Sequence, residues 1–176
     1  MPGSRSLSPA EIGDRLRARF GDDVLSVDDV HGHAVVAVGP ARSVEVATFL
    51  RDEPDLAFDY FDFLSAVDRT PKDGGFDVIT HVFSTHHNHH CRLRVAAGTD
   101  DPRVPTLSEV WAGANWCERE TWELFGITFE GHPHLLKLVL SEQFEGHPLR
   151  KDFPLMTREA KPWPGAVEGE EEEEEE

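Results

Sequence analysis

The stretch FDVITHVFSTHHNHHCRLRVAA, residues 76–97, decides the fold because it predicts two strands joined by a polar turn. Between positions 92 and 95, arginine alternates with leucine and valine, which is typical of an antiparallel strand with one buried face. We therefore interpret residues 76–84 and 91–97 as a hairpin and expect an antiparallel sheet around it.

Upstream of this hairpin, the sequence predicts a helix that begins at a clear cap. Ser8 is the cap, Pro9 lies in the first turn and Glu11 completes a capping box, and Gly21 ends the helix. Strands are expected at 24–27 and 34–38, an amphipathic helix at 40–51, and either a strand or a short buried helix at 58–67.

Downstream, residues 106–125 are expected to be mainly helical, with a break near Gly113 or Asn115. After Gly126 the chain is rich in turns. The order of elements predicts an α+β fold: an antiparallel sheet with helices packed on it, followed by an extended C-terminal docking segment. We expect a globular domain over 1–128, an interface segment over 129–156 and an acidic, disordered tail over 157–176.

The net charge of −17 is concentrated at the C-terminal end. Glu168 and the glutamates at 170–176 supply eight of these charges, which leaves −9 on residues 1–167. The sequence contains no basic stripe, so a nucleic-acid partner is not expected, and an acidic surface disfavours adsorption to anionic lipid.

The apolar runs are too short for a membrane span of about 20 residues, and the first residues lack the hydrophobic core of a signal peptide. Cys91 and Cys117 are too few for a disulfide framework or a four-thiolate cluster. We expect a cytosolic chain that holds no iron–sulfur cluster of its own.

The hairpin turn HHNHHC contains candidate transition-metal ligands: His86, His87, His89 and His90. Adjacent side chains diverge in such a turn, and the sequence shows no complementary ligand pair. The prediction is a solvated loop without a physiological metal ion.

The pentapeptide FEGHP occurs at 129–133 and again at 144–148. Gly tolerates unusual backbone angles and Pro restricts both itself and the preceding residue, so each copy predicts a fixed corner. His132 and His147 could be general bases, but no nucleophile motif accompanies them. We predict no catalytic residue, and a role for both histidines in backbone shape at a protein interface.

Residues 116–155 together resemble the thirty-kilodalton subunit of respiratory complex I, which is the C subunit of NADH:quinone oxidoreductase. The family's Glu-Arg-Glu signature, with an acid and two hydrophobic residues after a gap of two, is matched at 118–125. Its Gly-Ile-x-Phe-x-Gly-His-Pro is matched at 126–133, and its Glu-Gly-His-Pro-Leu-Arg-Lys-Asp-Phe-Pro at 145–154. Leu136 departs from the family, which commonly has a basic residue there.

The resemblance implies a subunit of the peripheral arm that binds no cofactor and packs against the D subunit, the 49 kDa homologue, and neighbouring peripheral-arm subunits. NADH, FMN, iron–sulfur clusters and quinone would belong to the rest of the complex, which lies at the cytoplasmic side of the cell membrane. Arg150, Lys151 and Asp152 are expected to form salt bridges to the D subunit. The expected interface residues are Glu118, Arg119, Glu120, Glu123, His132, Pro133, Gly146, His147, Pro148, Arg150, Lys151 and Asp152.

Three alternatives remain open at this point. The chain could be the equivalent scaffold subunit of a related membrane-bound hydrogenase or dehydrogenase complex. It could be a free-standing metal buffer that uses the histidine turn and the glutamate tail. A self-contained hydrolase has only isolated histidines in its favour.

Overall fold

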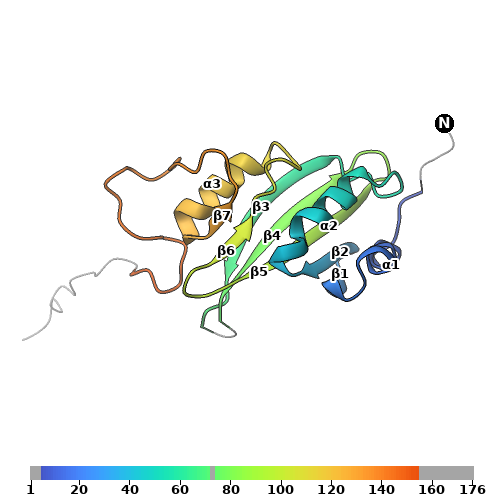
Figure 1. The fold of residues 1–176 in the computed structure, drawn as a ribbon, viewed down its shortest axis with the longest axis horizontal. Coiled ribbons are helices and arrows are strands. Elements are labelled where there is room, and N and C mark those ends of the chain that lie inside the picture. The colour runs from blue at the N-terminus through green and yellow to red at the C-terminus, as the bar shows by residue number, and fades with distance from the viewer. Residues whose placement is uncertain (1–4, 72–73, 155–176) are drawn as a thin grey trace, which may run out of the picture.

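A five-stranded mixed sheet is the centre of the fold, with strand order β1-β2-β5-β4-β3 (Figure 1). The computed structural model describes residues 5–71 and 74–154. The strands are β1 (Val24–Val30), β2 (His33–Val38), β3 (Tyr60–Asp68), β4 (Phe76–Ser84) and β5 (His89–Ala97). The α+β class is confirmed, and so is the hairpin of β4 and β5. An entirely antiparallel sheet is wrong, because β2 pairs with β5 in parallel.

The parallel pair joins two strands that are far apart in the sequence. Helix α2 (Pro40–Asp52), β3 and β4 all intervene between β2 and β5, so the two neighbours are distant in sequence. Local alternation predicts a strand but carries no information about which distant strand lies beside it.

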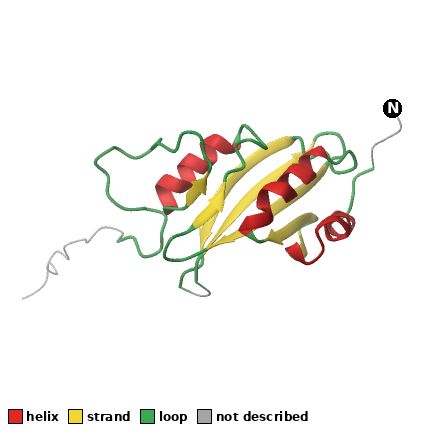
Figure 2. Ribbon diagram, viewed as in Figure 1, coloured by secondary structure: helices red, strands yellow, loops and turns green. Residues whose placement is uncertain are grey.

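Helices α1 (Pro9–Phe20) and α2 cover one face of the sheet (Figure 2). The capping box at α1 is confirmed: the Ser8 hydroxyl accepts a hydrogen bond from the Glu11 N–H, and the Glu11 carboxylate accepts one from the Ser8 N–H at 2.9 Å. A short 3-10 turn, η1 (Gly21–Asp23), follows α1. Ile12 and Leu50, one from each helix, are fully buried in the core.

The stretch expected at 58–67 contains a strand and not a helix: β3 begins at Tyr60 and runs along the edge of the sheet beside β4. Helix α3 (Ala114–Phe125) begins later than the sequence predicts. Residues 106–113 form turns and irregular chain instead. Leu107, Val110 and Trp111 are buried in the core there, and the Trp111 indole N–H donates to the Phe58 carbonyl at 3.0 Å.

Two short parallel strands, β6 (Arg103–Pro105) and β7 (Thr128–Glu130), bracket α3. The boundary expected between residues 128 and 129 falls within β7. From residue 131 to 154 the described chain has neither helix nor strand. The expected tail at 157–176 lies outside the described residues. Among the described residues, no helix is long and apolar enough to cross a membrane.

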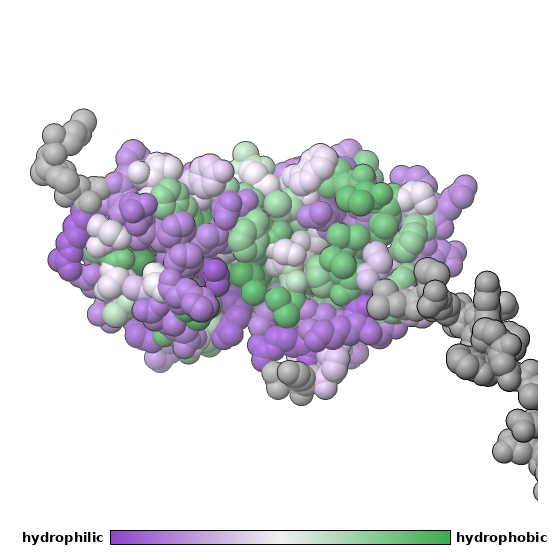
Figure 3. All heavy atoms as spheres, turned by 180° about the vertical axis from the view of Figure 1, so that it is seen from behind, coloured by the Kyte–Doolittle hydropathy of each residue, from purple (hydrophilic) through white to green (hydrophobic). Residues whose placement is uncertain are grey.

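Within residues 5–71 and 74–154, no helix covers the face of the sheet opposite α1 and α2. Figure 3 shows this side, where hydrophobic side chains gather toward the end from which the C-terminal chain leaves. Phe63 and Val67 of β3 are 41% and 46% exposed there.

Candidate functional site

The C-terminal segment, defined here as residues 131–154, is held against α3 by a buried carboxylate. Glu123 is 3% exposed and accepts hydrogen bonds from three consecutive backbone N–H groups: Leu138 at 2.8 Å, Val139 at 2.9 Å and Leu140 at 2.5 Å. Burial alone would raise the pKa of Glu123, but these N–H groups and Lys137 outweigh it and lower the pKa. Glu123 is therefore an anionic anchor for the segment.

Cationic side chains bind the carbonyl groups of the same stretch. Arg119 donates to the Leu136 carbonyl at 3.0 Å. Lys137 donates to three later carbonyls, including that of Phe144 at 2.9 Å. Arg119 and Glu123 could have paired along the helix, but each instead binds the backbone of the C-terminal segment.

The two histidines of the repeated pentapeptide also bind backbone. The His132 Nε2 donates to the Asn115 carbonyl at 3.2 Å, and its Nδ1 accepts from the His134 N–H at 3.0 Å. The His147 Nδ1 donates to the Glu123 carbonyl at 2.8 Å. Both corners are thus hydrogen-bonded to backbone carbonyls of α3.

Arg150 binds a backbone carbonyl at the C-terminal end of α3. Its Nε donates to the Phe125 carbonyl at 2.5 Å, and the guanidinium lies 5.1 Å from the centre of the Phe76 ring. The next residue, Lys151, donates its backbone N–H to Asp68 at 2.8 Å. The Arg150 guanidinium is therefore engaged within its own chain, whereas the side chains of Lys151 and Asp152 are exposed.

Glu118 is fully buried beneath the segment and accepts hydrogen bonds from the Leu107 N–H at 2.6 Å and the Thr106 hydroxyl at 2.5 Å. Burial raises its pKa to about 7, although the two hydrogen bonds oppose the rise. The His132 Nε2 lies 4.0 Å from its carboxylate. Although charged, both Glu118 and Glu123 are buried.

Apolar side chains remain on the outside of this assembly. Trp116 of α3 is 61% exposed, and Leu136, Val139 and Leu149 of the C-terminal segment are 52%, 63% and 50% exposed. We call these four side chains the outer apolar surface. Sequence reasoning missed them as a group, although Leu136 stood out as a departure from the family.

The other expected interface residues differ in backbone conformation and in exposure. Gly146 has a φ of +87° beside the Phe153 ring, where a side chain would be strained. Glu120 and Pro148 are half-buried, and Pro133 is exposed.

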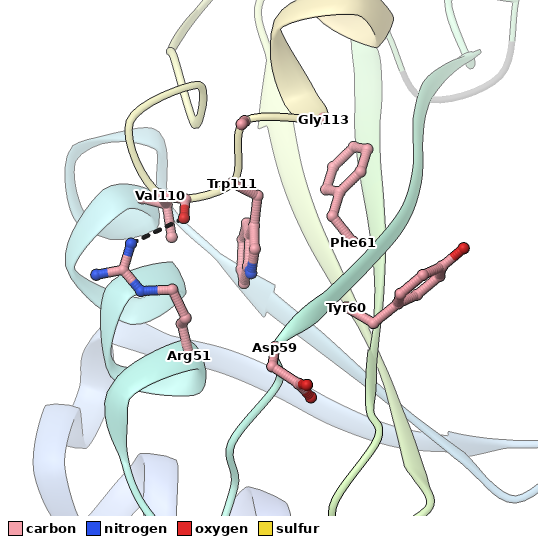
Figure 4. A pocket seen from close by; sticks show the side chains of 8 residues that line it. Arg51, Asp59, Tyr60, Phe61, Val110, Trp111 and Gly113 are labelled. Atoms are coloured by element: carbon pink, nitrogen blue, oxygen red, sulfur yellow. Dashed lines mark hydrogen bonds between the residues drawn. The ribbon is translucent and has the colours of Figure 1, made fainter.

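A shallow hollow of about 420 Å³ lies beside β3, between α2 and residues 110–113 (Figure 4). Its two charged side chains already have partners: Arg51 donates to the Val110 carbonyl at 2.8 Å, and Asp59 accepts from the N–H and hydroxyl of Thr85. Figure 4 shows no convergence of these groups on a common point, so the hollow has no arrangement for acid–base chemistry.

The histidines of the hairpin turn point in different directions. His89 is buried on the core side, where its Nδ1 accepts from the Leu7 N–H and its Nε2 donates to the Leu56 carbonyl at 2.7 Å. His87 donates to the Pro54 carbonyl, and His86 is exposed. His90 lies on the opposite face of the sheet.

The fold and the site define an α+β domain that holds an extended segment against its last helix and presents an apolar surface beside it. Comparison with known proteins then identifies the family. Residues 36–159 match the family described as respiratory-chain NADH dehydrogenase, 30 Kd subunit. The chain belongs to this family, which confirms the resemblance found in its signature residues.

Relatives share most of the chain. The NADH-quinone oxidoreductase C subunit of Roseiflexus sp. (strain RS-1) is 42% identical over 154 residues, covering 88% of each chain. The fused NADH-quinone oxidoreductase C/D subunit of Serratia proteamaculans (strain 568) is 45% identical over 160 residues, which cover 86% of this chain and 26% of that protein.

Two solved structures share the fold. A trypsin-resistant fragment of Nqo5 has a TM-score of 0.61 and 26% identity, and covers 72% of this chain and 98% of the fragment. A chain of an archaeal membrane-bound sulfane sulfur reductase has a TM-score of 0.69 over 84% of this chain and 86% of that one. At 22% identity, the second likeness concerns the fold alone.

Proposed function

We propose that this chain is a non-catalytic subunit of the peripheral arm of a proton-translocating NADH:quinone oxidoreductase. It supports assembly and the quinone-site subunit, which is the D subunit, and reaches the cytoplasmic side of the cell membrane only through the complex. NADH, FMN, the iron–sulfur clusters and quinone are bound by other subunits.

The observation that carries the proposal is that charged side chains of the family signature bind backbone groups of their own chain. Glu123, Arg119 and Arg150 are all engaged with backbone groups of their own chain. These side chains therefore hold the C-terminal segment in a fixed position. The outer apolar surface stays exposed and is available to a partner. Ordering before binding lowers the entropic cost of association.

The identity of the partner is supported by the relatives whose names carry the letters C/D. These names join a C part and a D part, and this chain matches about a quarter of each such protein. When a C part and a D part belong to one chain, the linkage favours contact between them. We infer that the D subunit covers the outer apolar surface, and that Lys151 and Asp152 supply polar contacts at its rim.

The test replaces Leu136 and Val139 together with glutamate in the complete complex. Both side chains are more than half exposed, so the free energy of unfolding of the isolated chain should change by no more than about 0.5 kcal/mol per site. Co-purification of the D subunit with this chain and NADH:quinone reductase activity should both fall.

The matched control is Leu25→Glu on β1, which is 66% exposed and lies outside the C-terminal segment. It should leave assembly and activity unchanged. Normal co-purification and activity of the Leu136/Val139 double variant would overturn the proposed interface.

The likeness to the sulfane sulfur reductase chain keeps a related membrane-bound complex as the second candidate. The same pull-down separates the two. A flavin-containing NADH module among the co-purifying proteins supports the first function, and a hydrogenase-type large subunit with metal-binding cysteines supports the second.

A further inference from the structure

Three histidines that are distant in sequence meet on the open face of the sheet. His33 of β2, His90 of β5 and His81 of β4 come from three adjacent strands. Their rings stack: the centres of His33 and His90 lie 4.4 Å apart, those of His81 and His90 5.3 Å, and those of His33 and His81 5.6 Å. One nitrogen of each ring lies within 4.8 Å of those of the other two.

Each ring in this histidine cluster has a buried nitrogen without a hydrogen-bond partner in the described structure. These atoms are the Nδ1 of His33, the Nε2 of His81 and the Nδ1 of His90. A buried polar atom left unsatisfied costs about 1–3 kcal/mol, so three in one place call for a common explanation. A bound cation that accepts three lone pairs would provide it.

The surroundings prepare the cluster for a metal ion. The Nδ1 of His81 lies 2.8 Å from the Asp62 carboxylate, which favours a proton on Nδ1 and a lone pair on Nε2. A carboxylate behind a metal-binding histidine is a frequent arrangement in metalloproteins.

We propose that His33, His81 and His90 bind one divalent transition-metal ion of the zinc class through three imidazole nitrogens. Imidazole suits zinc, copper and nickel, and three protein ligands leave a fourth position for water or for a partner's side chain. The ion would link β2, β5 and β4 on the face of the sheet opposite α1 and α2.

Binding requires a small closure of the cluster. Metal–nitrogen distances of about 2.0–2.1 Å in a tetrahedral site place the nitrogens roughly 3.3 Å apart, closer than the present 4.8 Å limit. His33 and His90 are only half-buried, so rotation of their side chains can bring the nitrogens together. Arg92 carries the positive charge that opposes the ion, and Asp62 the negative charge that favours it.

The test titrates the untagged full chain, stripped with chelator, with Zn²⁺ by calorimetry and with Co²⁺ by visible absorption. We expect one equivalent per chain and the absorption bands of low-coordinate Co²⁺. Substituting any one of the three histidines with glutamine should weaken affinity by about 100-fold or more, and Asp62→Asn by about 10–100-fold. Arg92→Gln should strengthen it.

The matched controls are His86→Gln and His134→Gln, two exposed histidines outside the cluster. They should leave both affinity and stoichiometry unchanged. Affinity no tighter than about millimolar, binding that survives His33→Gln, or binding abolished by His86→Gln would overturn the proposal. His33→Gln changes a half-buried side chain at the start of β2, so the test does not depend on the folding of the His81 variant.

Discussion

The Glu123 carboxylate on α3 accepts a hydrogen bond from the backbone N–H of Leu138 at 2.8 Å, across 15 residues of sequence. This relationship joins the last helix to the C-terminal segment. Because the same carboxylate also accepts from the two following N–H groups, one side chain sets the path of the segment.

Glu123→Ala should lower the free energy of unfolding by about 2–4 kcal/mol, because a hydrogen bond to a charged group contributes about 1.5–3 kcal/mol and the freed N–H groups regain water. Chemical denaturation measures the change. Proteolysis within 131–154 should become faster. Glu120→Ala is the control, because Glu120 lies on the same helix and makes no hydrogen bond to the segment among the described residues. Equal protease resistance of the two variants would contradict the anchor.

Glu118 should make the protein less stable as pH rises from about 4.5 to about 7. Its folded pKa of about 7 lies above the unfolded value of 4.5, so in this range the folded state keeps a proton that the unfolded state releases. Relative to Glu118→Gln, the wild type should lose up to about 3 kcal/mol across this range and then level off. Denaturation at a series of pH values measures it. A difference between the two proteins that stays constant from pH 4 to 8 would contradict the prediction.

Gly126→Ala should displace the second corner from α3. Gly126 has a φ of +72°, and a Cβ there would lie 2.5 Å from the His147 Nε2 and 2.6 Å from the Arg150 Nη2. The backbone angle alone costs about 1–2 kcal/mol. Gly32→Ala is the control, because Gly32 has a φ of +80° but open space around it. Thermal unfolding should show a larger loss of stability for Gly126→Ala than for Gly32→Ala, because only the first substitution clashes with His147 and Arg150. Equal losses would contradict the prediction.

The two cysteines should differ in reactivity. Cys91 is fully buried, and burial raises its pKa to about 12, whereas Cys117 is half-buried. Because the thiolate is the nucleophile, a disulfide reagent at pH 8 should modify Cys117 in the folded protein and Cys91 only on unfolding. Cys117→Ser should remove the fast phase. A fast phase that persists in this variant would contradict the assignment.

Local signals in the sequence were sufficient for several elements. The Ser8–Glu11 capping box and the alternation at 92–95 involve residues within one turn or one strand, so their structural consequence does not depend on distant chain. The start of α3 was not predictable in this way, since Trp111 leaves the helix to reach the Phe58 carbonyl 53 residues away.

The sequence indicated several residues of the candidate site, but not the groups that their side chains bind. The family signature indicated Glu118, Glu123 and Arg150, yet their side chains bind groups within the same chain. The outer apolar surface has no sequence period, because its members lie on a helix and on an irregular segment. His33 and His81 had no signal as ligands before the sheet placed them beside His90.

By itself, the sequence determined the class of fold, the hairpin, the capped first helix and the family, because these depend on local period, local capping and a contiguous signature. Only the tertiary structure decided that β2 and β5 are parallel, that two carboxylates of α3 are buried, and that three histidines meet on one face. The physical reason is that burial and strand neighbours are set by segments far apart in the chain, whose meeting no local pattern encodes.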